Sequence, residues 1–186
     1  MKRVIIIIIV IFSLISCQGN DLIKEFDCTS SVNMDDAKEM RDILEKFKII
    51  VPKSWKTQLY YDEFKSQIYS ADTTKSLTET YVLDIAWHQG ELKLNEFFEQ
   101  KVIDTLALKE QLTTYKSKFG KFHGKDAYWN LSEGIDSGYP YNHLELYIKI
   151  DLDEYFTITT KIYGQDNIDT RLCESILIVD KIKFNQ

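Results

Sequence analysis

The sequence has few of the residues that shape linkers, and its charge has the wrong sign for one large class of partners. Its 186 residues include only 2 Pro and 7 Gly, which excludes a collagen-like or linker-like chain. It has 29 Asp+Glu against 23 Lys+Arg, a net charge of −6. Nucleic-acid binders need a basic surface to replace phosphate counterions, so we expect no nucleic-acid partner. The hydrophobic content of 44% is ample for one packed domain.

The N-terminal sixteen residues have the pattern of an export signal. Met1-Lys2-Arg3 is followed by the apolar run Val4–Ile15, interrupted only by Ser13. This run is shorter than the roughly 20 residues that cross a bilayer as a helix, whereas a basic start, a short apolar run and a small residue are typical of a signal peptide. The run ends in Leu14-Ile15-Ser16-Cys17, which resembles the lipobox of bacterial lipoproteins.

The lipobox resemblance implies a membrane anchor. In that family the Cys thiol is diacylglycerylated, the chain is cut just before it, and the new amine is acylated, so Cys17 becomes the first mature residue. Two or three acyl chains hold a protein stably at a membrane. Gln18 follows the cysteine, and by resemblance the absence of Asp there favours the outer membrane of the cell envelope, with either face open. A plain secretory signal with a chance cysteine is the alternative.

Two cysteines are left once Cys17 is lipidated. Cys28 and Cys173 invite a disulfide in an oxidising compartment. The other interpretation is one exposed cysteine in a tether and one buried cysteine in a helix, and the sequence leaves both open.

The rest of the chain divides into a tether and one domain. We expect a tether over residues 17–33, at most about 50 Å long when extended, and a single domain over residues 34–186. Apolar residues at three- and four-residue steps predict helices over Met34–Lys46, over Leu94–Gln111 and from Ile168 onward. Asn33 is a candidate cap for the first helix.

Alternating patterns predict strands, mostly joined as hairpins. The clearest are the alternations from Leu144 to Ile150 and from Phe156 to Ile162, separated by the turn Asp151–Glu154. Hairpin-linked strands with helices at the start, middle and end predict an α+β fold, an antiparallel sheet flanked by helices.

One stretch carries a family resemblance. The apolar strand from Phe47 to Val51, then Pro52 and Trp55, resembles the opening of the PsbP-like superfamily, and the order of elements to Phe184 is similar too. The resemblance implies an α/β/α sandwich. The superfamily includes photosystem II extrinsic proteins, a Ran-binding nuclear protein and envelope lipoproteins similar to DcrB, which share partner binding rather than one chemistry.

Catalytic, metal and cofactor motifs are not recognisable. The three histidines, His88, His123 and His143, lack metal-ligand spacing, so we expect no metal and no cofactor. His143 and Glu145 share one face of a strand and form either a hydrolase acid–base pair or a surface ion pair. Asp151, Asp153 and Glu154 lack the EF-hand pattern that would make them a Ca²⁺ loop.

Tyrosines supply the one candidate contact surface. Tyr139-Pro140-Tyr141 is expected in a loop, where apolar rings with hydroxyls suit a partner surface. Further tyrosines in strands and loops are Tyr60, Tyr61, Tyr147 and Tyr155, and ordinary strand composition explains these equally well.

These observations favour a monomeric, non-catalytic, lipid-anchored envelope protein that binds another envelope protein. The acidic composition favours a basic partner and salt-sensitive binding. A narrower version is a toxin-immunity lipoprotein. The alternatives are a carrier of a small apolar ligand and a hydrolase that uses His143 and Glu145.

Overall fold

The computed structural model describes residues 21–29, 32 and 34–185; the signal peptide and Cys17 lie outside this range. In chain order the elements are α2 (Asp21–Glu25), β1 (Ala37–Arg41), β2 (Phe47–Pro52), β3 (Lys56–Tyr61), β4 (Lys65–Ala71), β5 (Tyr81–Gln89), α3 (Glu96–Thr105), the π-helix η1 (Leu106–Glu110), β6 (Thr113–Phe122), β7 (Lys125–Asp136), β8 (Tyr139–Lys149), β9 (Glu154–Tyr163), α4 (Ile168–Val179) and β10 (Lys183–Phe184).

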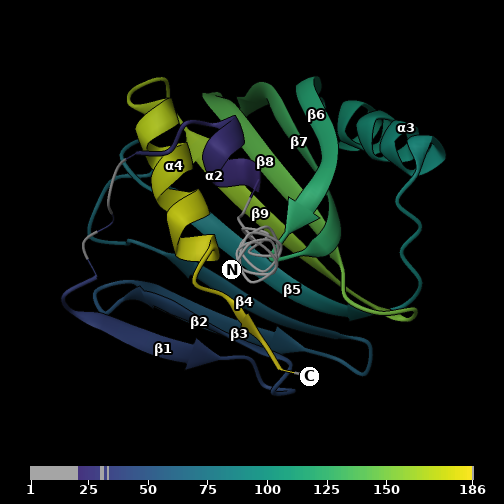
Figure 1. The fold of residues 1–186 in the computed structure, drawn as a ribbon. Helices are drawn as coiled ribbons and strands as arrows, with labels where there is room; N and C mark the ends of the chain where they lie inside the picture. The colour runs from purple at the N-terminus through teal and green to yellow at the C-terminus, as the bar shows by residue number, and fades with distance from the viewer. Residues whose placement is uncertain (1–20, 30–31, 33, 186) are drawn as a thin grey trace, which may run out of the picture.

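The strands form two antiparallel sheets (Figure 1). The large sheet has seven strands in the order β3-β4-β5-β9-β8-β7-β6, and the small sheet has three in the order β1-β2-β10. Hairpins join β3 to β4, β6 to β7, β7 to β8 and β8 to β9, whereas the pairing of β5 with β9 is long-range. The predicted helices from Leu94 and from Ile168 and the β8–β9 hairpin are confirmed.

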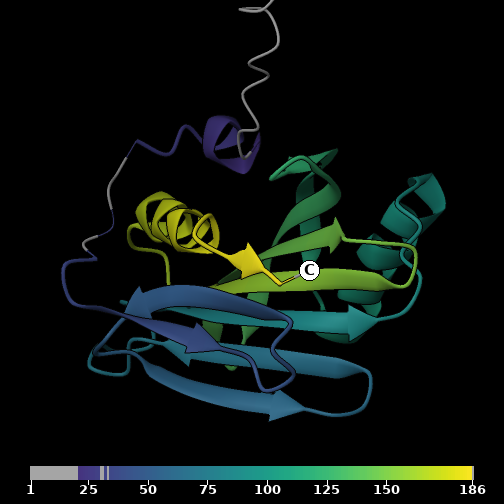
Figure 2. The same ribbon diagram turned by 60° about the horizontal axis from the view of Figure 1, so that its bottom comes forward.

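One face of the large sheet carries the main core. Along β9, Phe156, Ile158 and Ile162 are buried on this face, next to the buried face of β8. Helix α4, helix α2 and the small sheet cover it (Figure 2). Phe47 of β2 meets Phe156 edge to face, with ring centroids 5.2 Å apart, so the small sheet packs directly on the large one.

Among the described residues, only α3 and η1 cover the opposite face. They pack over β7 and β8 through a second cluster that is smaller than the main core; its buried members are Val102, Leu106, Leu112, Tyr128 and Tyr141. Helices therefore lie on both faces of an antiparallel sheet, and the predicted α+β sandwich is confirmed.

The predicted helix over Met34–Lys46 is wrong. This segment forms β1 and a turn, with Ala37 paired to Pro52 and Arg41 paired to Lys48 of β2. The turn is fixed by the buried carboxylate of Asp42, which accepts hydrogen bonds from the amides of Phe47 at 2.7 Å and Leu44 at 3.1 Å. Asp favours such side-chain-capped turns over helix interiors. The backbone pairing of this segment with β2 outweighs the helix that its apolar spacing predicts.

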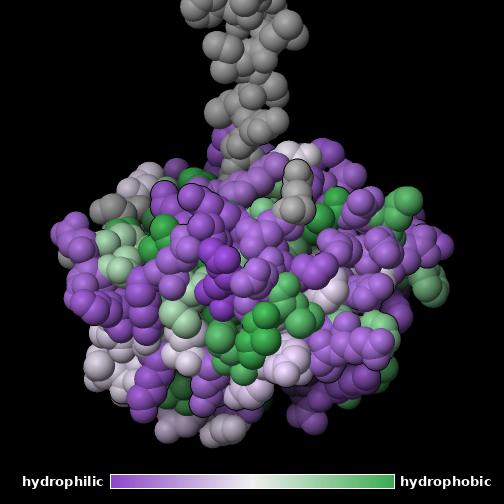
Figure 3. All heavy atoms as spheres, turned by 90° about the horizontal axis from the view of Figure 1, so that it is seen from below, coloured by the Kyte–Doolittle hydropathy of each residue, from purple (hydrophilic) through white to green (hydrophobic). Residues whose placement is uncertain are grey.

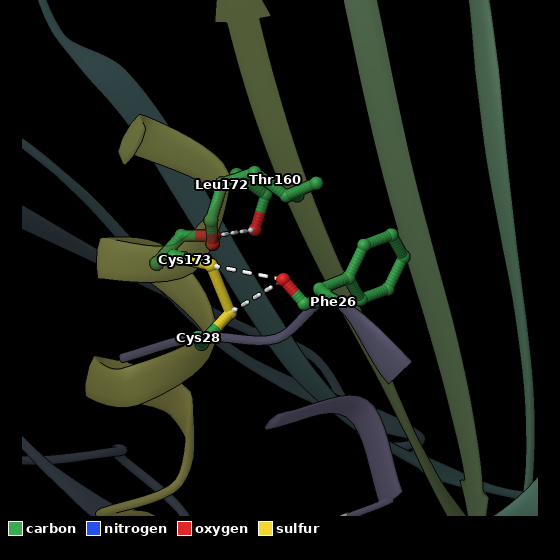
Figure 4. Close-up of a disulfide and its surroundings, with 6 residues drawn as sticks. Phe26, Cys28, Thr160, Leu172 and Cys173 are labelled. Atoms are coloured by element: carbon green, nitrogen blue, oxygen red, sulfur yellow. Dashed lines mark hydrogen bonds between the residues drawn. A yellow bond between two sulfur atoms is a disulfide. The ribbon is translucent and has the colours of Figure 1, made fainter. Parts of the chain in front are cut away.

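The segment expected to be a free tether is partly fixed to the domain. Cys28 and Cys173 of α4 form a disulfide with a Cα–Cα distance of 5.2 Å (Figure 4), within the usual range. The carbonyl oxygen of Phe26 lies 3.9 and 3.7 Å from the two sulfurs, which is a contact because a disulfide has no S–H to donate. Leu22 of α2 is 2% exposed and belongs to the main core.

Replacing both cysteines, Cys28→Ser with Cys173→Ser, should lower the free energy of unfolding. The disulfide closes a loop across a sequence separation of 145, worth up to about 5 kcal/mol in the chain-entropy model. Urea unfolding of the wild-type and double variant measures the loss. Reduced wild-type protein is the matched control and should unfold at the midpoint of the variant; an unchanged midpoint in both would contradict the prediction.

Candidate functional site

The helical cover of the second face is held at both ends by specific contacts. Asn95 caps α3 by accepting a hydrogen bond from the amide of Phe98 at 2.9 Å. η1 ends at Gln111 in the left-handed conformation, and Leu112 then inserts against Gly134 of β7. A Cβ at Gly134 would lie 2.7 Å from Leu112 Cδ2 and 2.9 Å from the carbonyl oxygen of Gln111, so only glycine allows this close approach.

A groove runs between this cover and strands β8 and β9, and we call it the α3 groove. It consists of two adjoining hollows, of about 220 and 330 Å³, that share Phe98, Lys101 and Tyr147. The first hollow reaches Glu110 and Glu145, and the second reaches Leu92, Phe97 and Tyr155. Phe98 meets Tyr147 edge to face, with centroids 5.0 Å apart. Aromatic walls with a few charged groups suit a peptide segment that has apolar side chains.

Glu145 is the chemically unusual residue of the groove. Burial raises the pKa of its carboxyl, and the Tyr147 hydroxyl and the Asn130 amide partly offset that rise. Glu110 at the groove rim raises the pKa of Glu145 further by like-charge repulsion. Burial also raises the pKa of the Tyr147 hydroxyl, with the charge of Glu145 as the next cause. A carboxyl of this kind favours a partner that brings a hydrogen-bond donor or a positive charge.

His143 does not form the surface ion pair that was one sequence-based interpretation. The residue is 3% exposed, and neither ring nitrogen has a hydrogen-bond partner among the described residues. The nearest carboxylate is Glu110, with Oε2 3.6 Å from Nδ1, and no hydrogen bond or ion pair joins His143 to Glu145 within the described residues. Burial, aided by the charge of Lys161, lowers the pKa of His143 to about 4, so the ring is neutral near pH 7.

Beyond the groove, half of the second face is uncovered by any described element. It is formed by β3, β4, β5 and β9. The strand register places Tyr60, Tyr69 and Tyr155 on the same face of the sheet as the groove. We call this surface the tyrosine face. His88 stacks on Tyr155 with centroids 4.8 Å apart, and its Nε2 lies 2.8 Å from the hydroxyl of Thr157. Burial lowers the pKa of His88 to about 4 as well.

The expected Tyr139-Pro140-Tyr141 surface is only partly present. These residues begin strand β8 instead of lying in a loop, because Ser137 and Gly138 make a tight turn with positive φ. Tyr141 is 4% exposed and packs against Tyr163, with ring centroids 4.9 Å apart, so it belongs to the second core. Tyr139 is exposed and remains a candidate contact residue with Pro140.

Two further sequence-based expectations concern metal and membrane. Among residues 21–29, 32 and 34–185, no group of three or more His, Cys, Asp or Glu side chains is placed to hold a metal ion. No helix in the same range is long and apolar enough to cross a membrane. The candidate lipidation site, Cys17, lies outside the described residues.

An exposed apolar area lies on the side of the molecule that β1–β4 form. Viewed from that side, apolar groups gather in one small area of a mostly hydrophilic surface (Figure 3). The exposed apolar side chains of these strands and their turns include Ile43, Tyr61 and Phe64. Nothing in the sequence distinguished them from core residues, because exposure here depends on which turns meet at this end of the sheets.

The fold is similar to that of known structures. It is a PsbP-like α+β fold: a solution structure of the cyanobacterial PsbP protein CyanoP, from Synechocystis sp. PCC 6803, is similar with a TM-score of 0.59 and 9% identity, covering 84% of this chain and 96% of that one. A structure from Bacteroides thetaiotaomicron VPI-5482 is similar with a TM-score of 0.53 and 11% identity, covering 81% of this chain and 49% of that one. No family model and no curated protein matches the sequence.

The buried neutral His143 should make the protein acid-labile. Between pH 6.5 and about 4 the unfolded chain takes up a proton on this ring and the folded chain does not, so the unfolding free energy falls as the pH falls through this window. His143→Asn should reduce the slope by up to about 1.4 kcal/mol per pH unit. Urea unfolding of wild type and variant from pH 4 to 8 measures this slope. The difference in unfolding free energy at pH 8, where the ring is neutral in both states, gives the loss of packing alone. An unchanged slope would contradict the prediction.

Proposed function

We propose that this protein is a lipid-anchored component of the bacterial cell envelope that binds another envelope protein through the α3 groove and the tyrosine face. The proposal does not include catalysis. The lipobox-like segment ending at Cys17 supports the anchor and the location. The PsbP-like fold supports a binding role only in general terms, because one fold serves many functions.

The observation that carries the binding role is the asymmetry of the large sheet. Its first face is covered by α2, α4 and the small sheet, whereas its second face has only α3 and η1 over β7 and β8 among the described elements. The remainder presents tyrosines, a stacked His88–Tyr155 pair and an adjoining groove. Tyrosine offers apolar contact area with a hydroxyl at little entropic cost, and it is enriched in protein interfaces.

The same geometry weakens the hydrolase alternative. A general base must reach the proton that it removes, but both nitrogens of His143 are enclosed by protein atoms and have no hydrogen-bond partner among the described residues. Glu145 faces the groove without a hydrogen bond to His143. The carrier alternative predicts a closed apolar cavity, whereas the two hollows of the groove carry Lys101, Glu110 and Glu145.

The test is in-cell crosslinking of the tagged full chain, with captured proteins identified by mass spectrometry. Tyr155→Ala should lose the partner, because removing a central interface aromatic costs about 2 kcal/mol or more, over 10-fold in affinity. Tyr139→Ala is the matched variant: an exposed tyrosine outside the groove lining, at which capture should persist.

Other outcomes point elsewhere. Loss with Tyr139→Ala alone would move the interface to the start of β8. A co-purifying apolar metabolite with no captured protein would contradict the proposal and favour the carrier. Thermal unfolding of each variant separates lost binding from lost stability.

A further inference from the structure

We propose that the side of the domain formed by α2 and β6 lies against the membrane, so that the short anchor sets the orientation of the whole protein. This inference rests on the proposed lipid at Cys17.

The chain between the proposed lipid and the folded domain is short. Only residues 18–20 separate Cys17 from Asp21, where α2 begins. Four residue steps of about 3.5 Å reach at most about 14 Å. A domain of this size is about 40 Å across. The connection is therefore too short for the far side of the domain to reach the bilayer surface.

Helix α2 is fixed to the domain and cannot lengthen this connection. Leu22 is buried in the main core, and the ring of Phe26 packs on Trp129 with centroids 5.1 Å apart. The Cys28–Cys173 disulfide then locks the segment to α4. Without these contacts the nearest fixed residue would be near Ala37 of β1, and a connection of about 20 residues could reach about 70 Å.

Charged side chains hold α2 against β6. Glu25 bridges Lys116 and Lys118 at 3.0 and 2.6 Å. The carboxylate of Asp21 accepts a hydrogen bond from the backbone amide of Lys121 at 2.8 Å. These contacts place the lysine-bearing strand β6 next to α2, only a few residues along the chain from Cys17.

Charge favours the same orientation. Helix α2 and strand β6 together carry four lysines and two carboxylates; they are Lys24, Lys116, Lys118, Lys121, Asp21 and Glu25. Without Lys2 and Arg3 the chain from Cys17 has 21 Lys+Arg against 29 Asp+Glu, a net charge of −8. The negative excess therefore lies elsewhere, and the net positive charge of α2 and β6 favours an anionic lipid surface.

The orientation directs the β3–β4 hairpin away from the membrane. Strand β3 lies at the opposite side of the domain from α2 in both ribbon views (Figures 1 and 2). The turn of this hairpin carries Asp62 and Glu63, between the exposed Tyr61 and Phe64. The acidic and aromatic end is thus the end presented to the compartment.

The experiment uses the chain from Cys17 onward with its disulfide formed, so that Cys17 is the single free thiol. This thiol is coupled to a maleimide phospholipid in vesicles of phosphatidylcholine and phosphatidylglycerol that contain a nickel-chelating quencher lipid. A fluorescent unnatural amino acid replaces either Lys24 on α2 or Glu63 on the β3–β4 turn. Quenching should be at least threefold stronger at position 24, and equal quenching would overturn the proposal.

A matched variant carries a twenty-residue Gly/Ser insertion after Asn20. If the short connection sets the orientation, the insertion should remove the difference between the two positions; an unchanged difference would overturn that explanation. Because the lipid is attached chemically, this result is independent of natural lipidation. Natural lipidation is read separately from the membrane fraction of cells expressing wild-type or Cys17→Ser protein.

Discussion

The antiparallel pairing of β8 with β9 is the constraint on which the rest of the structure depends. Side chains alternate across a strand, so the pairing of Leu146 with Ile158 on one face places Tyr147 and Thr157 on the other. The first face becomes a continuous apolar core. The second collects tyrosines, histidines and Glu145, and these residues make the groove and the tyrosine face. A one-residue shift in this register would exchange the two surfaces.

Burying polar groups on the second face lowers the stability of the domain, and the apolar core on the first face offsets this loss. His143, Tyr128 and Glu145 are desolvated beneath or beside α3 and η1, and buried groups without full hydrogen bonding are unfavourable. The main core combines the large sheet, the small sheet and α4, and it tolerates this cost. A π-helix at the edge of such a region is typical of functional sites.

Much of this fold could be predicted from the sequence because its strongest patterns are local. The alternation in β8 and β9 and the four-residue steps in α3 and α4 each come from one surface of one element. The helix expected over Met34–Lys46 failed because Asp42 and the long-range partner β2 decide that segment. The exposed loop position expected for Tyr141 was wrong for a similar reason, since its burial depends on η1 and on Tyr163. Likewise, the groove exists only where α3 crosses β8, and no local pattern records that crossing.

Strand β6 is an edge of the large sheet, and helix α2 covers part of it. Edge strands expose backbone groups that can pair with other chains. Here the backbone amide of Lys121 donates a hydrogen bond to the carboxylate of Asp21 instead. Gly120 has no side chain and leaves room for that carboxylate. The disulfide that holds this cover forms only in an oxidising compartment. Without the disulfide, α2 would cover the β6 edge less firmly, and this edge would be more open to strand addition between copies.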